Sequence, residues 1–169
     1  MALRLGFCTI TLQPEAEPDV TSRWCITEEA LQISLNTKEI EHHDIALELL
    51  LCLGQVLWGK LSELQVGAYW RLLADEMNAG IEGEIDEQAL AEKQALLKDR
   101  RAESIASYGR ASFAGTVAEY VHALWHDVTI RRGRKYLPAE PLRRRLRLLA
   151  QWFPPDRGHL LFPPRRPRT

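Results

Sequence analysis

The sequence predicts a mainly α-helical fold of the α+β class, in which about five helices pack as an antiparallel, bundle-like domain after a short N-terminal β-hairpin or strand pair. Three observations predict it. Residues that cap helices recur between amphipathic stretches from residue 36 onward. The connections between these stretches are short, which makes consecutive helices antiparallel neighbours. Earlier in the chain there are instead two short runs rich in β-branched and aromatic residues.

The two N-terminal runs are LRLGFCTITL (residues 3–12) and VTSRWCIT (residues 20–27). The linker between them, QPEAEPD, contains prolines and acidic residues and is typical of a turn. This arrangement predicts a β-hairpin or two edge strands. Residues 28–35 suit either a strand or a helix, because the local pattern does not separate the two in so short a run.

Five helices are expected, over residues 36–58, 62–79, 86–108, 112–132 and 138–153. Their starts are marked by capping residues or by proline. Asn36 with Glu39, and Ser62 with Gln65, have the spacing of a capping box. The remaining starts are marked by Asp86, Ser112 and the stretch from Pro138 to Pro141. The first four helices are expected to end at Gly59, Gly80, Gly109 and Gly133.

A chain of 169 residues most simply forms one domain, large enough to bury a core without disulfides or metals. We expect that domain to span residues 1–162, with the β element in 1–27 and the helical core in 36–153. The remaining segment, PPRRPRT at 163–169, is a basic tail. Its prolines disfavour a helix or a central strand, so we expect the tail to be flexible.

The overall composition is that of a globular protein, with 46% hydrophobic and 27% charged residues. No apolar run approaches the ~18 residues of a membrane span, and the N-terminus lacks the features of a signal peptide. We therefore expect a cytoplasmic protein with no membrane span. The three cysteines are widely spaced and form no C-x-x-C pair, which argues against a disulfide framework or a cysteine-rich zinc site.

The charges are divided unevenly along the chain. Residues 1–98 carry 7 Lys and Arg against 17 Asp and Glu, whereas residues 99–169 carry 15 against 6. Such a division has two interpretations: a separate interaction surface of each sign, or two halves that neutralise each other when they pack together. The second interpretation is the simpler one.

The stretch AEYVHALWHDV, residues 118–128, has the histidine spacing of a metal-binding helix. A hydrolytic H-E-x-x-H helix would need a glutamate at position 123 as general base, and Ala123 stands there. A second type of metal site uses Glu-x-x-His pairs inside a helical bundle. That pattern occurs twice, as EIEH and EYVH, and Glu76, Glu87 or Glu103 could add carboxylates. The candidate metal ligands are Glu39, His42, Glu119, His122 and His126.

Helical geometry sets a condition on this site, because each residue turns about 100° around the axis. Glu119, His122 and His126 then share one face, roughly opposite the apolar residues of the same helix. In the first helix, Glu39 and His42 project on the apolar side. The two pairs can therefore hold the same metal only if the fourth helix is buried on two sides.

The C-terminal helix carries a basic face. Arg143, Arg144 and Arg147 lie opposite a stripe of leucines at helical spacing. Together with the basic segments RRGRK and RRPR, this face could contact a nucleic acid or an anionic membrane surface. A sequence pI near 6.5 and the absence of a nucleic-acid recognition motif argue against it.

No catalytic signature is present: neither a G-x-S-x-G turn nor a Gly-rich phosphate loop occurs. We therefore expect a non-catalytic, cytoplasmic binding or assembly protein that acts through helical surfaces, without a cofactor. Its partner would be a second copy of the chain or another protein. Two alternatives stay open: a metal-binding helical protein that holds a divalent transition metal, and an anion-binding protein that uses the basic C-terminal helix.

Overall fold

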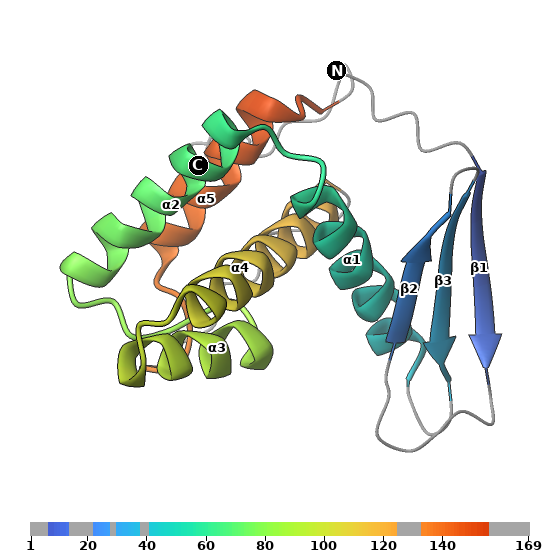
Figure 1. The fold of residues 1–169 in the computed structure, drawn as a ribbon, viewed down its shortest axis with the longest axis horizontal. Helices are drawn as coiled ribbons and strands as arrows, with labels where there is room; N and C mark the ends of the chain where they lie inside the picture. Colours follow the sequence, from blue (N-terminus) through green and yellow to red (C-terminus); the bar gives the residue numbers. More distant parts are fainter. Residues whose placement is uncertain (1–6, 14–21, 28–29, 38–40, 125–132, 156–169) are drawn as a thin grey trace, which may run out of the picture.

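The computed structural model describes residues 7–13, 22–27, 30–37, 41–124 and 133–155. It confirms a mainly helical α+β fold with a small N-terminal sheet (Figure 1). The strands are β1 (Phe7–Gln13), β2 (Ser22–Ile26) and β3 (Ala30–Asn36). The helices are α1 (His42–Trp58), α2 (Glu63–Asn78), α3 (Glu87–Lys98), α4 (Ala102–Ala123) and α5 (Ala139–Trp152).

The sheet has the strand order β1-β3-β2, so β3 lies in the middle and the first two strands are the edges. Strand β1 is parallel to β3, with Ile10 opposite Ile33, and β2 is antiparallel to β3. One face of β3 packs on α1, where Leu31, Ile33 and Leu35 are each only 1% exposed. This face and the facing side of α1 form a small hydrophobic core of their own.

The larger core surrounds α4, which lies in the middle of the helices (Figure 1). Twelve residues of α4 are buried, because α1, α3 and α5 all pack against it. Helices α1 and α4 approach closely at Gly54, where an added Cβ would lie 2.6 Å from the Cα atom of Ala114. Helices α2 and α5 lie side by side on the far side of α4 from the sheet (Figure 1).

Several predicted boundaries were wrong. The β element reaches Asn36, which ends β3 and caps no helix, so residues 30–35 are strand and the helical core begins later than expected. The break between the third and fourth helices falls at residues 99–101. Gly109 lies inside α4, where the Trp70 ring packs so closely that an added Cβ would meet it at 2.7 Å. The sequence therefore has a glycine at position 109 because the Trp70 ring packs there, and this glycine was wrongly interpreted as the end of a helix.

The capping signals at Ser62 and Asp86 were predicted correctly. Ser62 and Gln65 form the expected capping box at the start of α2, and the Asp86 side chain accepts a hydrogen bond from the Ala89 amide. Within the described residues, no single helix is both long and apolar enough to cross a membrane. Helices α1 and α2 reach that composition only when taken together, and they are bent by 119° at the break between them.

Candidate functional site

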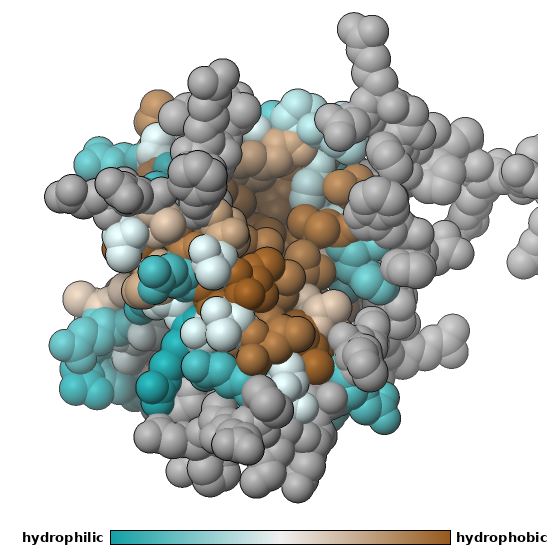
Figure 2. All heavy atoms as spheres, turned by 90° about the vertical axis from the view of Figure 1, so that its right-hand side faces the viewer, coloured by the Kyte–Doolittle hydropathy of each residue, from teal (hydrophilic) through white to brown (hydrophobic). Residues whose placement is uncertain are grey.

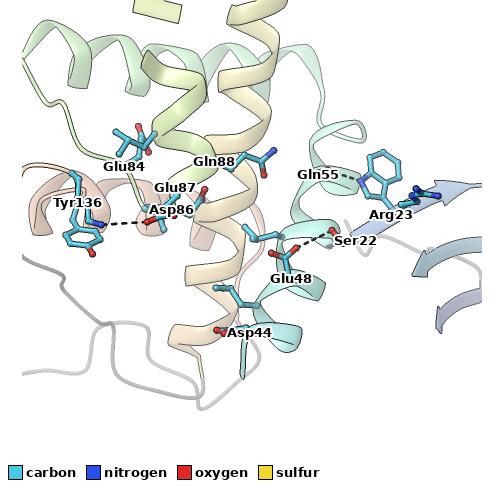
Figure 3. Close-up of a pocket in the computed structure, with 16 residues that line it drawn as sticks. Ser22, Arg23, Asp44, Glu48, Gln55, Glu84, Asp86, Glu87, Gln88 and Tyr136 are labelled. Carbon is cyan, nitrogen blue, oxygen red and sulfur yellow. Dashed lines mark hydrogen bonds and ion pairs between the residues drawn. The ribbon is translucent and has the colours of Figure 1, made fainter. Parts of the chain in front are cut away.

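An open cleft of about 1030 Å³ lies between the sheet and the helices (Figure 3). One side is formed by β2 and by the side of α1 that carries Asp44, Glu48 and Gln55. The other side is formed by the start of α3, residues 84–88, and by the neighbouring pair Lys135 and Tyr136. The cleft therefore lies where segments from three distant parts of the sequence meet.

The wall formed by β2 and α1 is held by two side-chain hydrogen bonds (Figure 3). The Ser22 hydroxyl donates to a carboxylate oxygen of Glu48 at 3.2 Å. The Trp24 indole N–H donates to the side-chain oxygen of Gln55 at 2.9 Å. The polar side of α1 is thus turned toward β2, which fixes the sheet against the helix and leaves Asp44 exposed at the edge of the cleft.

The opposite wall begins at Asp86, the N-cap of α3. Its Oδ1 atom accepts a hydrogen bond from the Ala89 amide at 2.8 Å. Its Oδ2 atom is buried and has no hydrogen-bond partner among the described residues. Burial raises the pKa of Asp86 above its ordinary value. Gly115 makes room for this oxygen, because a Cβ at that position would collide with Oδ2.

The segment that precedes α3 pairs with the segment that precedes α5. The amide of Glu84 donates to the carbonyl of Lys135, and the amide of Leu137 donates to the carbonyl of Glu84. This pairing places the Lys135 ammonium 3.7 Å from the carboxylate of exposed Glu87 and 5.1 Å from the centre of the Tyr136 ring. Tyr136 thereby offers an aromatic surface to the cleft.

A buried group of charges lies behind the cleft, centred on Arg145 of α5, which is completely buried. Its guanidinium donates to both carboxylate oxygens of Glu76 on α2 and to both of Glu84. It also donates to the Ser112 hydroxyl of α4 at 2.8 Å. These contacts use every N–H group that a guanidinium has. Arg145 of α5 therefore joins α2, α4 and the cleft wall at Glu84 at one point.

Glu84 receives further partners on its Oε1 atom. The Lys93 ammonium lies at 3.2 Å and the Tyr108 hydroxyl donates at 2.5 Å. Lys93 is itself 1% exposed and also donates to the carbonyl of Gly83. Two buried cations thus balance two buried carboxylates, Glu76 and Glu84. Because buried charges are stable only when paired and hydrogen-bonded, this group is a structural centre, and both oxygens of its Glu84 carboxylate already accept hydrogen bonds.

Burial alone would raise the pKa of Glu84, but Arg145 and Lys93 outweigh it and lower the pKa from 4.5 to about 2. Burial and the adjacent Glu84 carboxylate raise the pKa of Tyr108, which stays a neutral donor. Burial raises the pKa of Tyr69 to about 12, although Arg145 opposes the shift. At neutral pH Glu84 is therefore ionised, while Tyr69 and Tyr108 are neutral.

This arrangement predicts loss of stability in acid. Glu84 has a lower pKa when folded than when unfolded, so its contribution is fully present above pH 4.5 and is lost as the pH falls toward about 2. We expect the free energy of unfolding, measured by urea titration, to fall across that window. The change in the free energy of unfolding with pH should be smaller in Glu84→Gln, and it should be unchanged in the exposed control Glu103→Gln. If the free energy of unfolding depended equally on pH in Glu84→Gln and in the native protein, Glu84 would not be the source of the acid sensitivity.

The candidate metal ligands are only partly placed by the structure. Glu39 and His126 lie outside the described residues, as does the basic tail at 163–169, and the side chain of His42 is also outside them. Glu119 and His122 are half-buried on α4, and Glu119 lines a small pocket beside Asp86. Helix α4 is buried all round at residues 111–118, but Glu119 and His122, on the face that would hold the metal, are not among its buried residues. The described residues contain no group of three side chains that could hold a metal ion.

The carboxylates that could have completed the metal site are elsewhere. Glu76 is bonded to Arg145, while Glu87 and Glu103 are exposed on the first turns of their helices. The metal site thus remains a prediction. Within the described part of the chain, these carboxylates do not lie beside Glu119 and His122.

The basic face of α5 lies beside carboxylates. Arg143 and Arg147 are 3.9 Å and 3.6 Å from the carboxylate of Glu140, and Arg144 is 3.4 Å from Asp75 on α2. These pairs are exposed, so each contributes little to stability. They do reduce the positive potential of the face. Arg144–Asp75, the two Arg145 pairs and Lys135–Glu87 join the basic half of the sequence to the acidic half, whereas Glu140 belongs to the basic half itself.

Sequence reasoning missed Arg145, although a signal was present. Arg145 lies one position before Leu146 and four before Leu149, within the apolar stripe of its helix. Glu76 likewise follows Tyr69 by seven residues on the buried face of α2. A charged residue inside an apolar stripe indicates a buried pair, but its partners can be identified only once the helices are placed.

Comparisons with family models, with curated proteins and with solved structures find no match to this chain.

Proposed function

We propose that this is a non-catalytic binding protein whose cleft holds a Lys- or Arg-rich segment of another protein. The observation that carries the proposal is the charge of the cleft walls. Asp44, Glu48, Asp86 and Glu87 supply four carboxylates besides the neutralised Glu84, against the two cations Arg23 and Lys135. This excess of negative charge favours a positively charged partner and would increase its rate of association.

The other side chains of the cleft fit the same partner. Trp24 and Tyr136 present aromatic rings at opposite walls, and cations bind favourably over the faces of such rings. Lys135 of the same chain already lies over the Tyr136 ring, 5.1 Å from its centre, so Trp24 is the ring left for a partner's cation. The cleft is also open and wide enough for an extended segment. Helices α1 and α3 form much of its walls, together with strand β2.

The binding role without catalysis is supported by the composition of the walls. The described residues that line the cleft include no histidine and no cysteine, and the hydroxyl of Ser22 is directed to Glu48. A nucleophile needs an adjacent base that can accept its proton near neutral pH. The exposed carboxylates of Asp44 and Glu87 are poorly suited to that role.

The proposal predicts the effect of removing two exposed carboxylates. Asp44 and Glu87 lie in the first turns of α1 and α3, one on each wall. We expect Asp44→Asn/Glu87→Gln to weaken binding of a short Lys/Arg/Gly peptide by roughly fivefold, because each exposed ion pair contributes about 0.5 kcal/mol. Isothermal titration calorimetry at low and moderate salt measures this change.

A matched control is available in the same chain. Glu63 and Glu103 are also exposed and also lie in the first turns of helices, α2 and α4, away from the cleft. Glu63→Gln/Glu103→Gln removes the same charge from the same helical position and should leave the affinity within twofold. A peptide with citrulline and acetyl-lysine in place of its cations should not bind. Equal weakening by both double variants would show a general charge effect and would overturn the proposal.

A further inference from the structure

Strand β1 forms one edge of the sheet. Among the described residues, β1 pairs only with β3, so its other side is open. Its sequence, FCTITLQ, contains no charged residue and no proline. Natural proteins usually protect an edge strand with lysine, proline or a covering segment, since an open edge pairs readily with another strand. The structure describes no such protection on β1.

The direction of the backbone groups on β1 follows from one hydrogen bond. The amide of Thr37 donates to the carbonyl of Gln13, so the backbone of Gln13 is directed toward β3. Successive residues in a strand direct their N–H and C=O groups to alternate sides. Thr9 and Thr11 are therefore bonded to β3, whereas the backbone groups of Cys8, Ile10 and Leu12 are directed to the open edge.

The same residues carry the exposed apolar side chains. Cys8, Ile10 and Leu12 pair with Leu31, Ile33 and Leu35 and so lie on the same face of the sheet. Helix α1 covers that face over β3 and β2, while on β1 Ile10 is 47% and Leu12 is 57% exposed. Figure 2 shows this end of the molecule, where hydrophobic side chains gather around a hollow.

The sequence of β1 is close to symmetric about Ile10, with Thr9 and Thr11 on either side and Cys8 and Leu12 beyond them. A twofold axis through Ile10 would place each Ile10 opposite its equivalent, and Cys8 opposite Leu12 of the second copy. All these would be hydrogen-bonded pairs, in which two residues exchange both backbone bonds. On the other face Thr9 would meet Thr11, a favourable cross-strand pair.

We propose that β1 pairs antiparallel with β1 of a second copy of this chain, in the register centred on Ile10. The pairing joins two sheets into one and brings the exposed apolar residues of both copies together on one face. The strand carries no charge, so two copies meet without repulsion. The described lining of the cleft includes β2 but not β1, so this interface is independent of the proposed peptide binding.

A single introduced cysteine tests both the partner and the register. In a Cys25→Ser background, Leu12→Cys places a thiol opposite Cys8 of the second copy, at the ~5.5 Å Cα separation of a hydrogen-bonded pair, which suits a disulfide. We expect mild oxidation to give a dimer in which mass spectrometry finds Cys8 of one copy linked to the introduced thiol of the other. Thr11→Cys, on the opposite face, should give little or none.

Light scattering across protein concentrations provides the second readout. The native mass should rise from one chain toward two, and Ile10→Lys should stay at one, while Thr9→Lys on the other face still associates. Circular dichroism shows whether each variant is folded. If Ile10→Lys is unfolded, the disulfide cross-linking experiment tests the proposal instead. A native chain that stays monomeric, equal cross-linking of Leu12→Cys and Thr11→Cys, or a linkage within one chain would overturn the proposal.

Discussion

Replacing Arg145 with methionine is expected to lower the free energy of unfolding by about 3–5 kcal/mol, the range found when one partner of a buried ion pair is removed. Methionine fills much of the space but donates no hydrogen bond. Glu76 then loses its cation, and Glu84 keeps one cation, Lys93, and the Tyr108 hydroxyl. Urea denaturation followed by circular dichroism measures the loss.

The neighbouring arginine is the control for this variant. Arg144 is on the same helix and pairs with exposed Asp75, so Arg144→Met should change the free energy of unfolding by less than about 1 kcal/mol. The double variant Arg145→Met/Glu76→Met should be more stable than Arg145→Met alone, because it leaves no uncompensated charge beside the remaining Glu84–Lys93 pair. Similar effects at Arg145 and Arg144 would contradict the burial of the group.

Replacing Gly54 with alanine is expected to destabilise the protein by about 2–3 kcal/mol, in the range found for overpacked cores. The added Cβ would lie 2.6 Å and 2.9 Å from the Cα and carbonyl oxygen of Ala114, so only a shift of the α4 backbone can relieve the contact. The thermal midpoint and the urea titration should both decrease.

The same substitution at Gly67 separates packing from helix propensity. Gly67 lies within α2 and has no atom within 4 Å of an added Cβ. Gly67→Ala should therefore stabilise the protein by about 0.5–1 kcal/mol, because alanine favours the helix. If Gly54→Ala were also stabilising, α1 and α4 would not be as close as the structure places them.

The fold class could be predicted from sequence because it depends on local signals. The capping box at Ser62 and the N-cap at Asp86 act through residues three positions away, and such contacts leave a readable pattern. Asn36 and Gly109 were misassigned for the opposite reason. Asn36 ends a strand whose partners are distant in sequence, and Gly109 receives the ring of Trp70 from another helix.

The sheet topology and the cleft also depend on distant contacts. Strand β1 pairs with β3 across a gap that includes all of β2, and nothing in the local pattern of either strand specifies a parallel partner. The cleft joins β2 and α1 to the start of α3 and to Lys135 and Tyr136. The sequence did show that the first half of the chain is acidic, and the cleft walls come mostly from that half.

The most direct test of the proposed function is an NMR titration of the isotopically labelled protein with the Lys/Arg/Gly peptide. We expect backbone amide shifts to change at residues 22–24, 44–48 and 84–88, which form the two walls of the cleft. The Asp44→Asn/Glu87→Gln variant should need several times more peptide for the same changes. Two results would contradict the assignment of the cleft as the binding site. One is shift changes confined to other surfaces; the other is no shift change at a peptide concentration high enough to saturate an unrelated polyanion of similar charge.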